Sequence, residues 1–155
     1  MKLSSSAFHD GAKIPIKYVM PGAGGQNVSV PLAWSGAPAG TKSLALAMVD
    51  PHPVARNWVH WLVIDLPAET TAIAEGASGH KMPPGAVELK NSFGDLGYGG
   101  PQPPKGSGDH PYVFTLYALS VPKLGLGANT SLTAFQQALA GKVLGEAKIT
   151  GYYGR

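Results

Sequence analysis

Two polar side chains interrupt one of the most apolar stretches of the chain, VDPHPVARNWVHWLVIDLP at residues 49–67. Asp50 lies near the start of this stretch, and His60 lies inside it. A stretch this apolar predicts a buried strand. A carboxylate or an imidazole in such a strand must be paired or must bind something, because burying it alone is costly. The pattern therefore indicates either a buried polar network or a binding site.

The directions of these side chains can be counted, because successive residues of a strand point to opposite faces. Counting odd and even positions along each strand predicts that Asp50, His60 and Tyr112 point to the same face as apolar residues of their own strand. Asp50 shares its face with Leu44, Leu46 and Met48. His60 shares its face with Trp58, Leu62 and Ile64, and Tyr112 shares its face with Phe114 and Leu116. Asp50 ends one strand and His110 precedes another, so we expect all four polar residues at one small pocket. Taken singly, each also fits a hydrogen-bonded core residue or a turn.

The elements that must position these residues are mostly strands. Period-2 alternation or continuous apolar runs predict strands at 13–20, 27–34, 43–50, 58–65, 112–121 and 145–154. A helical pattern lies within 130–141, with Thr130 or Ser131 as N-cap and Gly141 as terminator. We therefore expect an all-β fold, an antiparallel β-sandwich with a short helix before the C-terminal strand. The Gly- and Pro-rich segment 66–111 is long enough to predict loops that serve a site.

Composition limits the classes of function. The chain of 155 residues predicts a single domain over 1–155. Its net charge of +3 comes from scattered Lys and Arg residues, which does not indicate nucleic-acid binding. It contains no cysteine, so disulfides, thiol nucleophiles and Cys-based zinc sites are excluded. Because no signal-peptide core and no membrane-length apolar stretch is found, we expect a cytoplasmic protein without an integral membrane segment.

Several segments together resemble the phosphatidylethanolamine-binding protein (PEBP) family, in particular its bacterial and archaeal Raf-kinase-inhibitor-like branch. The segments are VDPHP, NWVHWLVIDLP, NSFGDLGYGGPQPPKGSGDHPYVFTLYAL and ALAGKVLGEAKITGYYGR. Asp50 and Pro51 match the DPDxP box of that family. Gly108 and His110 match its GxHR box, which Tyr112 follows. The order and spacing agree over essentially the whole chain.

The resemblance implies Greek-key connections and a small pocket that accepts phosphate, acetate or a phosphorylated head group. It implies ligand-binding roles for the polar groups Asp50, His60, His110 and Tyr112, for the wall residue Trp58, and for the rim residues Gly100, Pro101, Pro103 and Pro104. Two positions depart from the family pattern. His52 replaces the second Asp of the first box, and we interpret it as a solvated turn residue. Pro111 replaces the Arg of the second box, which removes a fixed positive charge.

We therefore predict a binding protein for a small anionic or phosphorylated ligand, in a regulatory or inhibitor-like module. A phosphorylated protein is a candidate partner, and bacterial relatives suggest a homodimer. Imidazole N–H groups and the Tyr112 hydroxyl are expected to hold the anion, with affinity falling as pH rises through the histidine range. His110→Ala is expected to weaken binding with little change in the fold. No cofactor, catalytic residue or metal ligand is assigned.

Two alternatives stay open at this point. A hydrolase built on the Asp, His and Tyr pocket is one, although no G-x-S-x-G motif is present and neither Ser92 nor Ser107 has the sequence context of a nucleophile. The other is a metal site formed by four side chains, although the H-E-x-x-H spacing is missing. Its ligands would be Asp50, His52, His60 and His110.

Overall fold

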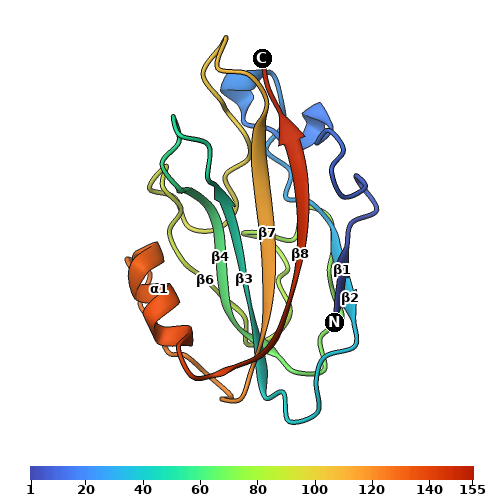
Figure 1. The fold of residues 1–155 in the computed structure, drawn as a ribbon, viewed down its shortest axis with the longest axis vertical. Helices are drawn as coiled ribbons and strands as arrows, with labels where there is room; N and C mark the ends of the chain where they lie inside the picture. The colour runs from blue at the N-terminus through green and yellow to red at the C-terminus, as the bar shows by residue number, and fades with distance from the viewer.

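The computed structural model describes residues 1–155, which form two antiparallel sheets and one short helix (Figure 1). The smaller sheet has the order β1–β2–β5, with β1 at Lys2–Ser4, β2 at Leu32–Ser35 and β5 at Ala72–Ile73. The larger has the order β6–β4–β3–β7–β8, with β6 at Val87–Glu88, β4 at Trp58–Pro67, β3 at Ser43–Asp50, β7 at His110–Leu119 and β8 at Val143–Tyr153. The β-rich prediction is confirmed, whereas the sandwich with Greek-key connections stays a prediction.

The predicted helix is present as α1, Leu132–Leu139. Ser131 is its N-cap, and the Ser131 hydroxyl accepts a hydrogen bond from the Ala134 N–H at 3.1 Å. The helix buries Phe135 and Leu139 against one face of the larger sheet, where they meet apolar residues of β3 and β4. The other face of that sheet shares a larger hydrophobic cluster with the smaller sheet, which includes Trp34.

The strand predicted at 13–20 is wrong. This segment instead holds a short 3-10 helix, Ile16–Tyr18, and a second one follows at Pro21–Ala23. Pro15 begins the first turn, and its carbonyl oxygen accepts a hydrogen bond from the Tyr18 N–H at 3.1 Å. Ile14 and Tyr18 of the apolar alternation are buried, but Ile16 between them is 56% exposed, so the set does not form one continuous buried face. The strand predicted at 27–34 is limited to β2.

One extra residue in β4 changes the side to which His60 points. Met48 of β3 faces Trp61, but the next residue, Val49, faces Val59, so His60 is the additional residue of a β-bulge. After the bulge, Trp61 belongs to the cluster between the sheets, whereas Leu62 belongs to the helix side. The predicted parity of His60 with Leu62 and Ile64 is therefore wrong, because a bulge breaks the period of two.

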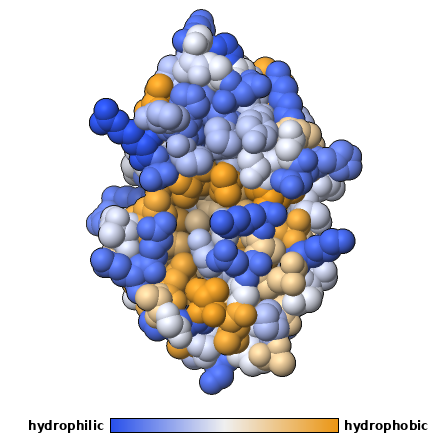
Figure 2. All heavy atoms as spheres, in the orientation of Figure 1, coloured by the Kyte–Doolittle hydropathy of each residue, from blue (hydrophilic) through white to orange (hydrophobic).

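The sheet brings the polar strand ends together. Asp50 at the end of β3 faces Trp58 at the start of β4, and His110 at the start of β7 faces Tyr153 near the end of β8. These ends lie at the same end of the sheet as the C-terminus (Figure 1). In the same orientation, polar side chains cover most of the upper end of the surface, and apolar ones gather across and below its middle (Figure 2).

Candidate functional site

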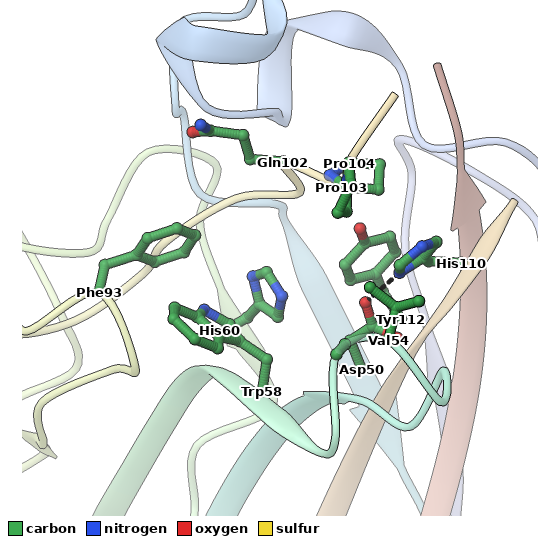
Figure 3. A pocket seen from close by; sticks show the side chains of 11 residues that line it. Asp50, Val54, Trp58, His60, Phe93, Gln102, Pro103, Pro104, His110 and Tyr112 are labelled. Atoms are coloured by element: carbon green, nitrogen blue, oxygen red, sulfur yellow. Dashed lines mark hydrogen bonds and ion pairs between the residues drawn. The ribbon is translucent and has the colours of Figure 1, made fainter. Parts of the chain in front are cut away.

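A cavity of about 270 Å³ lies at this end of the larger sheet (Figure 3). Its polar side chains come from segments that are far apart in the sequence, namely the end of β3, β4, the loop before β7, and the start of β7. Its lining consists of Asp50, Val54, Ala55, Trp58, His60, Phe93, Gln102, Pro103, Pro104, His110 and Tyr112. Seven of the nine predicted site residues are among them. Phe93 and Gln102 were not predicted from the sequence, because both lie in loops without a periodic pattern.

Gly100 and Pro101, predicted at the rim, do not line the cavity. They connect the loop to the segment that contains the two 3-10 helices. The Gly100 N–H donates to Asn27 Oδ1 at 2.7 Å, and the Pro101 carbonyl oxygen accepts from the Met20 N–H at 2.9 Å. A side chain at position 100 would overlap the carbonyl oxygen of Tyr18. Their role in the structure is therefore close backbone packing rather than contact with the cavity.

Asp50 and His110 form a buried ion pair in the cavity wall. His110 Nδ1 lies 2.6 Å from Asp50 Oδ2, and His110 Nε2 lies 2.8 Å from the Ser107 hydroxyl oxygen. That hydroxyl donates its own proton to the Pro104 carbonyl oxygen at 2.6 Å. Ser107 therefore accepts from Nε2, and the carboxylate accepts from Nδ1, so the bonding pattern places a proton on both nitrogens of His110.

This chain of contacts has the residue order of a Ser-His-Asp triad but not its proton arrangement. A nucleophilic serine donates its proton to a neutral histidine. Ser107 donates to Pro104 instead, and His110 has no free nitrogen to act as a base. The arrangement favours a structural network over the hydrolase alternative.

His52 is held in the turn that follows β3. The His52 N–H donates to Asp50 Oδ1 at 2.9 Å, and His52 Nδ1 accepts from the Val54 N–H at 3.1 Å. Its ring stacks on that of His110, with centroids 3.8 Å apart and planes 6° from parallel. These contacts agree with the turn interpretation of His52. No three His, Asp or Glu side chains in residues 1–155 are grouped so as to hold a metal ion, so the alternative metal site has no ligand set.

His60 is the second buried imidazole of the cavity and is 3% exposed. Its Nδ1 lies 2.6 Å from the Gly99 carbonyl oxygen, which can only accept a hydrogen bond, so Nδ1 carries a proton. Burial lowers the pKa of His60 to about 4 and outweighs the opposing effects of the Gly99 and Gly100 carbonyls and of Asp50. His60 is therefore neutral at neutral pH, and its Nε2 bears a lone pair.

The Tyr112 hydroxyl is the other polar end that faces the cavity. Tyr112 is 1% exposed, and burial together with the nearby Asp50 raises the pKa of its hydroxyl, which stays protonated. Every side-chain nitrogen and oxygen sealed inside the protein has a hydrogen-bond partner. The Tyr112 hydroxyl and His60 Nε2 have none in the protein, so both must open onto the cavity, as their orientation in Figure 3 shows.

Comparison with known proteins places this chain and its fold in a known family. The family model described as phosphatidylethanolamine-binding protein matches residues 4–154. The chain belongs to this family. A UPF0098 protein of Methanothermobacter thermautotrophicus is 41% identical to it, with 100% of this chain and 99% of that protein covered. The UPF0098 protein YbhB of Escherichia coli is also 41% identical, over 87% of this chain and 89% of its own length. The predicted resemblance to the PEBP family is confirmed.

A solved structure gives the same result for the fold. The crystal structure of Escherichia coli YbcL, described as a new member of the mammalian PEBP family, superposes with a TM-score of 0.93 at 36% identity. The match covers 99% of this chain and 98% of YbcL. No helix in this PEBP chain has the length and apolarity needed to cross a membrane.

The structure places a cation that the sequence did not indicate, Arg155, next to the loop that lines the cavity of this PEBP chain. Arg155 Nε donates to the Pro103 carbonyl oxygen at 2.6 Å, and its Nη1 donates to the Gly22 carbonyl oxygen at 3.0 Å. Its charge acts on Tyr112, where it opposes part of the rise in the hydroxyl pKa. Arg155 therefore places a positive charge next to Pro103 of the cavity wall, whereas Pro111 carries no charge.

The low pKa of His60 makes stability depend on pH. In the unfolded chain an imidazole binds its proton near pH 6.5, whereas in the fold His60 binds it only near pH 4. Between these values the unfolded chain holds more protons, so stability falls as pH falls. His60→Gln removes this titration. We expect the stability of the wild type relative to His60→Gln to decrease by about 3 kcal/mol between pH 7 and pH 4.

Urea unfolding of both proteins across this pH range measures the difference. His9→Gln, which changes an exposed imidazole, is the matched control and should show no comparable pH-dependent difference. A constant difference between wild type and His60→Gln over the whole range would contradict the assignment of a neutral, buried His60.

Proposed function

We propose that this PEBP chain binds a small anion, either free phosphate or the phosphoryl group of a larger molecule, in the cavity of Asp50, His60, His110 and Tyr112. The observation that carries the proposal is the pair of polar atoms without a partner, His60 Nε2 and the Tyr112 hydroxyl. Both atoms open onto the cavity, where a ligand that both donates and accepts hydrogen bonds can bond to the two of them at once.

The charges around the cavity support an anion. His110 offsets the charge of Asp50 within the ion pair, and Arg155 adds a cation beside Tyr112. The walls contributed by Trp58 and Phe93 are apolar, with the two rings in edge-to-face contact at 5.3 Å. Walls of this kind exclude water, which strengthens hydrogen bonds between the ligand and the polar groups.

The side chain expected to donate a hydrogen bond to the anion differs from the one predicted from the sequence. Both nitrogens of His110 are already engaged by Asp50 and Ser107, and Nδ1 of His60 is engaged by Gly99. Among the four polar residues predicted from the sequence, the Tyr112 hydroxyl is therefore the donor proposed for the anion. A regulatory role, a phosphorylated protein partner and a homodimer stay predictions that follow from the resemblance. A cytoplasmic location stays a prediction from the sequence.

Tyr112→Phe tests the proposal because it removes this donor and leaves the buried ring in place. Hydrogen bonds to charged groups contribute about 1.5–3 kcal/mol, so the affinity for methyl phosphate should fall by about tenfold or more. Calorimetric titration of wild type and variant at pH 5.5 measures the change. Tyr152→Phe, at an exposed position of β8, is the control and should bind as the wild type does.

Two results would count against the site. One is equal affinity of Tyr112→Phe and wild type for methyl phosphate, which would mean that the hydroxyl does not contact the anion. The other is no binding of methyl phosphate by the wild type at any pH between 5 and 8, which would exclude a phosphoryl ligand of this size.

A further inference from the structure

We propose that His60 makes this cavity selective for anions that carry a proton, so that it takes a phosphomonoester in its singly protonated form and rejects an isosteric sulfate monoester. This inference rests on the proposed function, because it specifies which anion the same cavity accepts. It assigns to His60 a role as hydrogen-bond acceptor, in contrast to the donor role expected from the sequence.

The first step is the position of the proton on His60. The Gly99 carbonyl oxygen lies 2.6 Å from Nδ1, and a carbonyl oxygen cannot donate. The Gly99 N–H in turn donates to the His60 carbonyl oxygen at 2.8 Å, so residue 99 holds both the backbone and the ring of His60. A neutral imidazole with its proton on Nδ1 has only a lone pair on Nε2, and Nε2 lies on the side of the ring that faces Tyr112 and Asp50 (Figure 3).

The second step concerns the groups around His60. The rings of Phe93 and Tyr112 pack edge-to-face against it, with centroids 5.7 and 5.0 Å away. The two charged groups that act on it, Asp50 and His110, are paired with each other and have opposite effects. No Lys or Arg lines the cavity. The surroundings of His60 therefore keep its imidazole neutral.

The third step is the complementarity of the ligand. A sulfate monoester has only acceptor oxygens, and one of them would face the lone pair of Nε2 without a shared proton. A singly protonated phosphomonoester has the same shape and charge, but its P–O–H group can donate to Nε2 while another oxygen accepts from the Tyr112 hydroxyl. A buried acceptor left opposite another acceptor loses a hydrogen bond and keeps the desolvation cost.

The direct test compares methyl phosphate with methyl sulfate by calorimetric titration of the wild-type protein at pH 5.5. At this pH both ligands are mostly monoanions, because a phosphate monoester loses its second proton near pH 6. We expect methyl phosphate to bind about tenfold or more tightly than methyl sulfate. Equal affinity would overturn the proposal and leave the proposed anion site intact, whereas no binding of either ligand would instead overturn the proposed function.

A second measurement identifies the group that sets the pH dependence. We expect the affinity for methyl phosphate to fall as pH rises above about 6, because the proton that His60 accepts is lost from the ligand. With methylphosphonate, whose second ionisation occurs at higher pH, the midpoint should move upward with the ligand. A midpoint that is the same for both ligands would mean that a protein group controls binding, which would contradict the proposal.

A variant connects the selectivity to His60 itself. The side-chain amide of His60→Gln can turn to present either its N–H₂ or its oxygen to the ligand. The variant should therefore bind methyl phosphate and methyl sulfate with nearly equal affinity. His9→Gln should keep the wild-type preference. If His60→Gln folds and keeps the full preference, His60 does not select the ligand. If His60→Gln does not fold, the comparison of methyl phosphate with methyl sulfate on the wild type still tests the proposed selectivity.

Discussion

Replacing His110 by alanine should destabilise the protein by about 3–5 kcal/mol. The sequence predicted little change in the fold, but the structure places His110 and Asp50 together in the interior, 1% and 2% exposed. Alanine would leave the carboxylate of Asp50 buried with only the His52 N–H as a close partner. It would also remove the partner of Ser107 and the ring on which His52 stacks. A buried charge without its partner is among the most costly changes in a protein interior.

Urea unfolding at neutral pH measures this effect, with His80→Ala at an exposed position as the control. The double variant Asp50→Ala/His110→Ala separates the loss of packing from the orphaned charge. Because the double variant buries no carboxylate, its destabilisation should be smaller than the sum of the two single changes. A loss below about 1 kcal/mol for His110→Ala, or simple additivity of the two changes, would contradict the buried ion pair.

Gly100→Ala should destabilise the protein by more than about 3 kcal/mol, which is at the upper end of overpacking effects. The added Cβ would overlap the Tyr18 carbonyl oxygen and lie 3.0 Å from Val19 Cα. Both neighbours are backbone atoms of the segment at 16–19, and the Gly100 N–H is bonded to Asn27. Neither residue 100 nor the segment at 16–19 can move without breaking these hydrogen bonds, so no small shift removes the overlap.

The matched control is Gly127→Ala, because no atom lies within 4 Å of a Cβ at that position. It should be neutral or slightly stabilising, since alanine reduces the freedom of the unfolded chain. Thermal and urea unfolding of both variants measure the difference. If Gly100→Ala unfolds like the control, the close packing between residue 100 and the segment at 16–19 does not form in solution.

These two changes affect the cavity through different parts of the fold. His110 belongs to the wall itself, whereas Gly100 holds the loop that carries Gln102, Pro103 and Pro104 over it. A Gly100 variant that stays folded should therefore bind methyl phosphate less tightly although residue 100 does not line the cavity. Stability and the shape of the cavity are coupled here because one loop serves both.

The sequence by itself determined the strands that support the site and two of its polar residues. Asp50 ends β3 and Tyr112 lies in β7, and along both strands the period of two is a local property of extended backbone. The same count was wrong for His60, because the β-bulge depends on pairing with a neighbouring strand. The apolar alternation at 13–20 was misleading as well, since Pro15 begins a 3-10 turn there.

Only the tertiary structure decided what the polar groups can do. The Gly99 carbonyl oxygen, 39 residues away in the sequence, fixes the proton of His60 on Nδ1. Ser107 and Asp50 together engage both ring nitrogens of His110. Arg155 reaches Pro103 across 52 residues and supplies a charge beside Tyr112 that no motif indicated. Such contacts come from loops, which have no periodic pattern to read. Whether an imidazole donates or accepts depends on the partner that the fold brings to its other nitrogen.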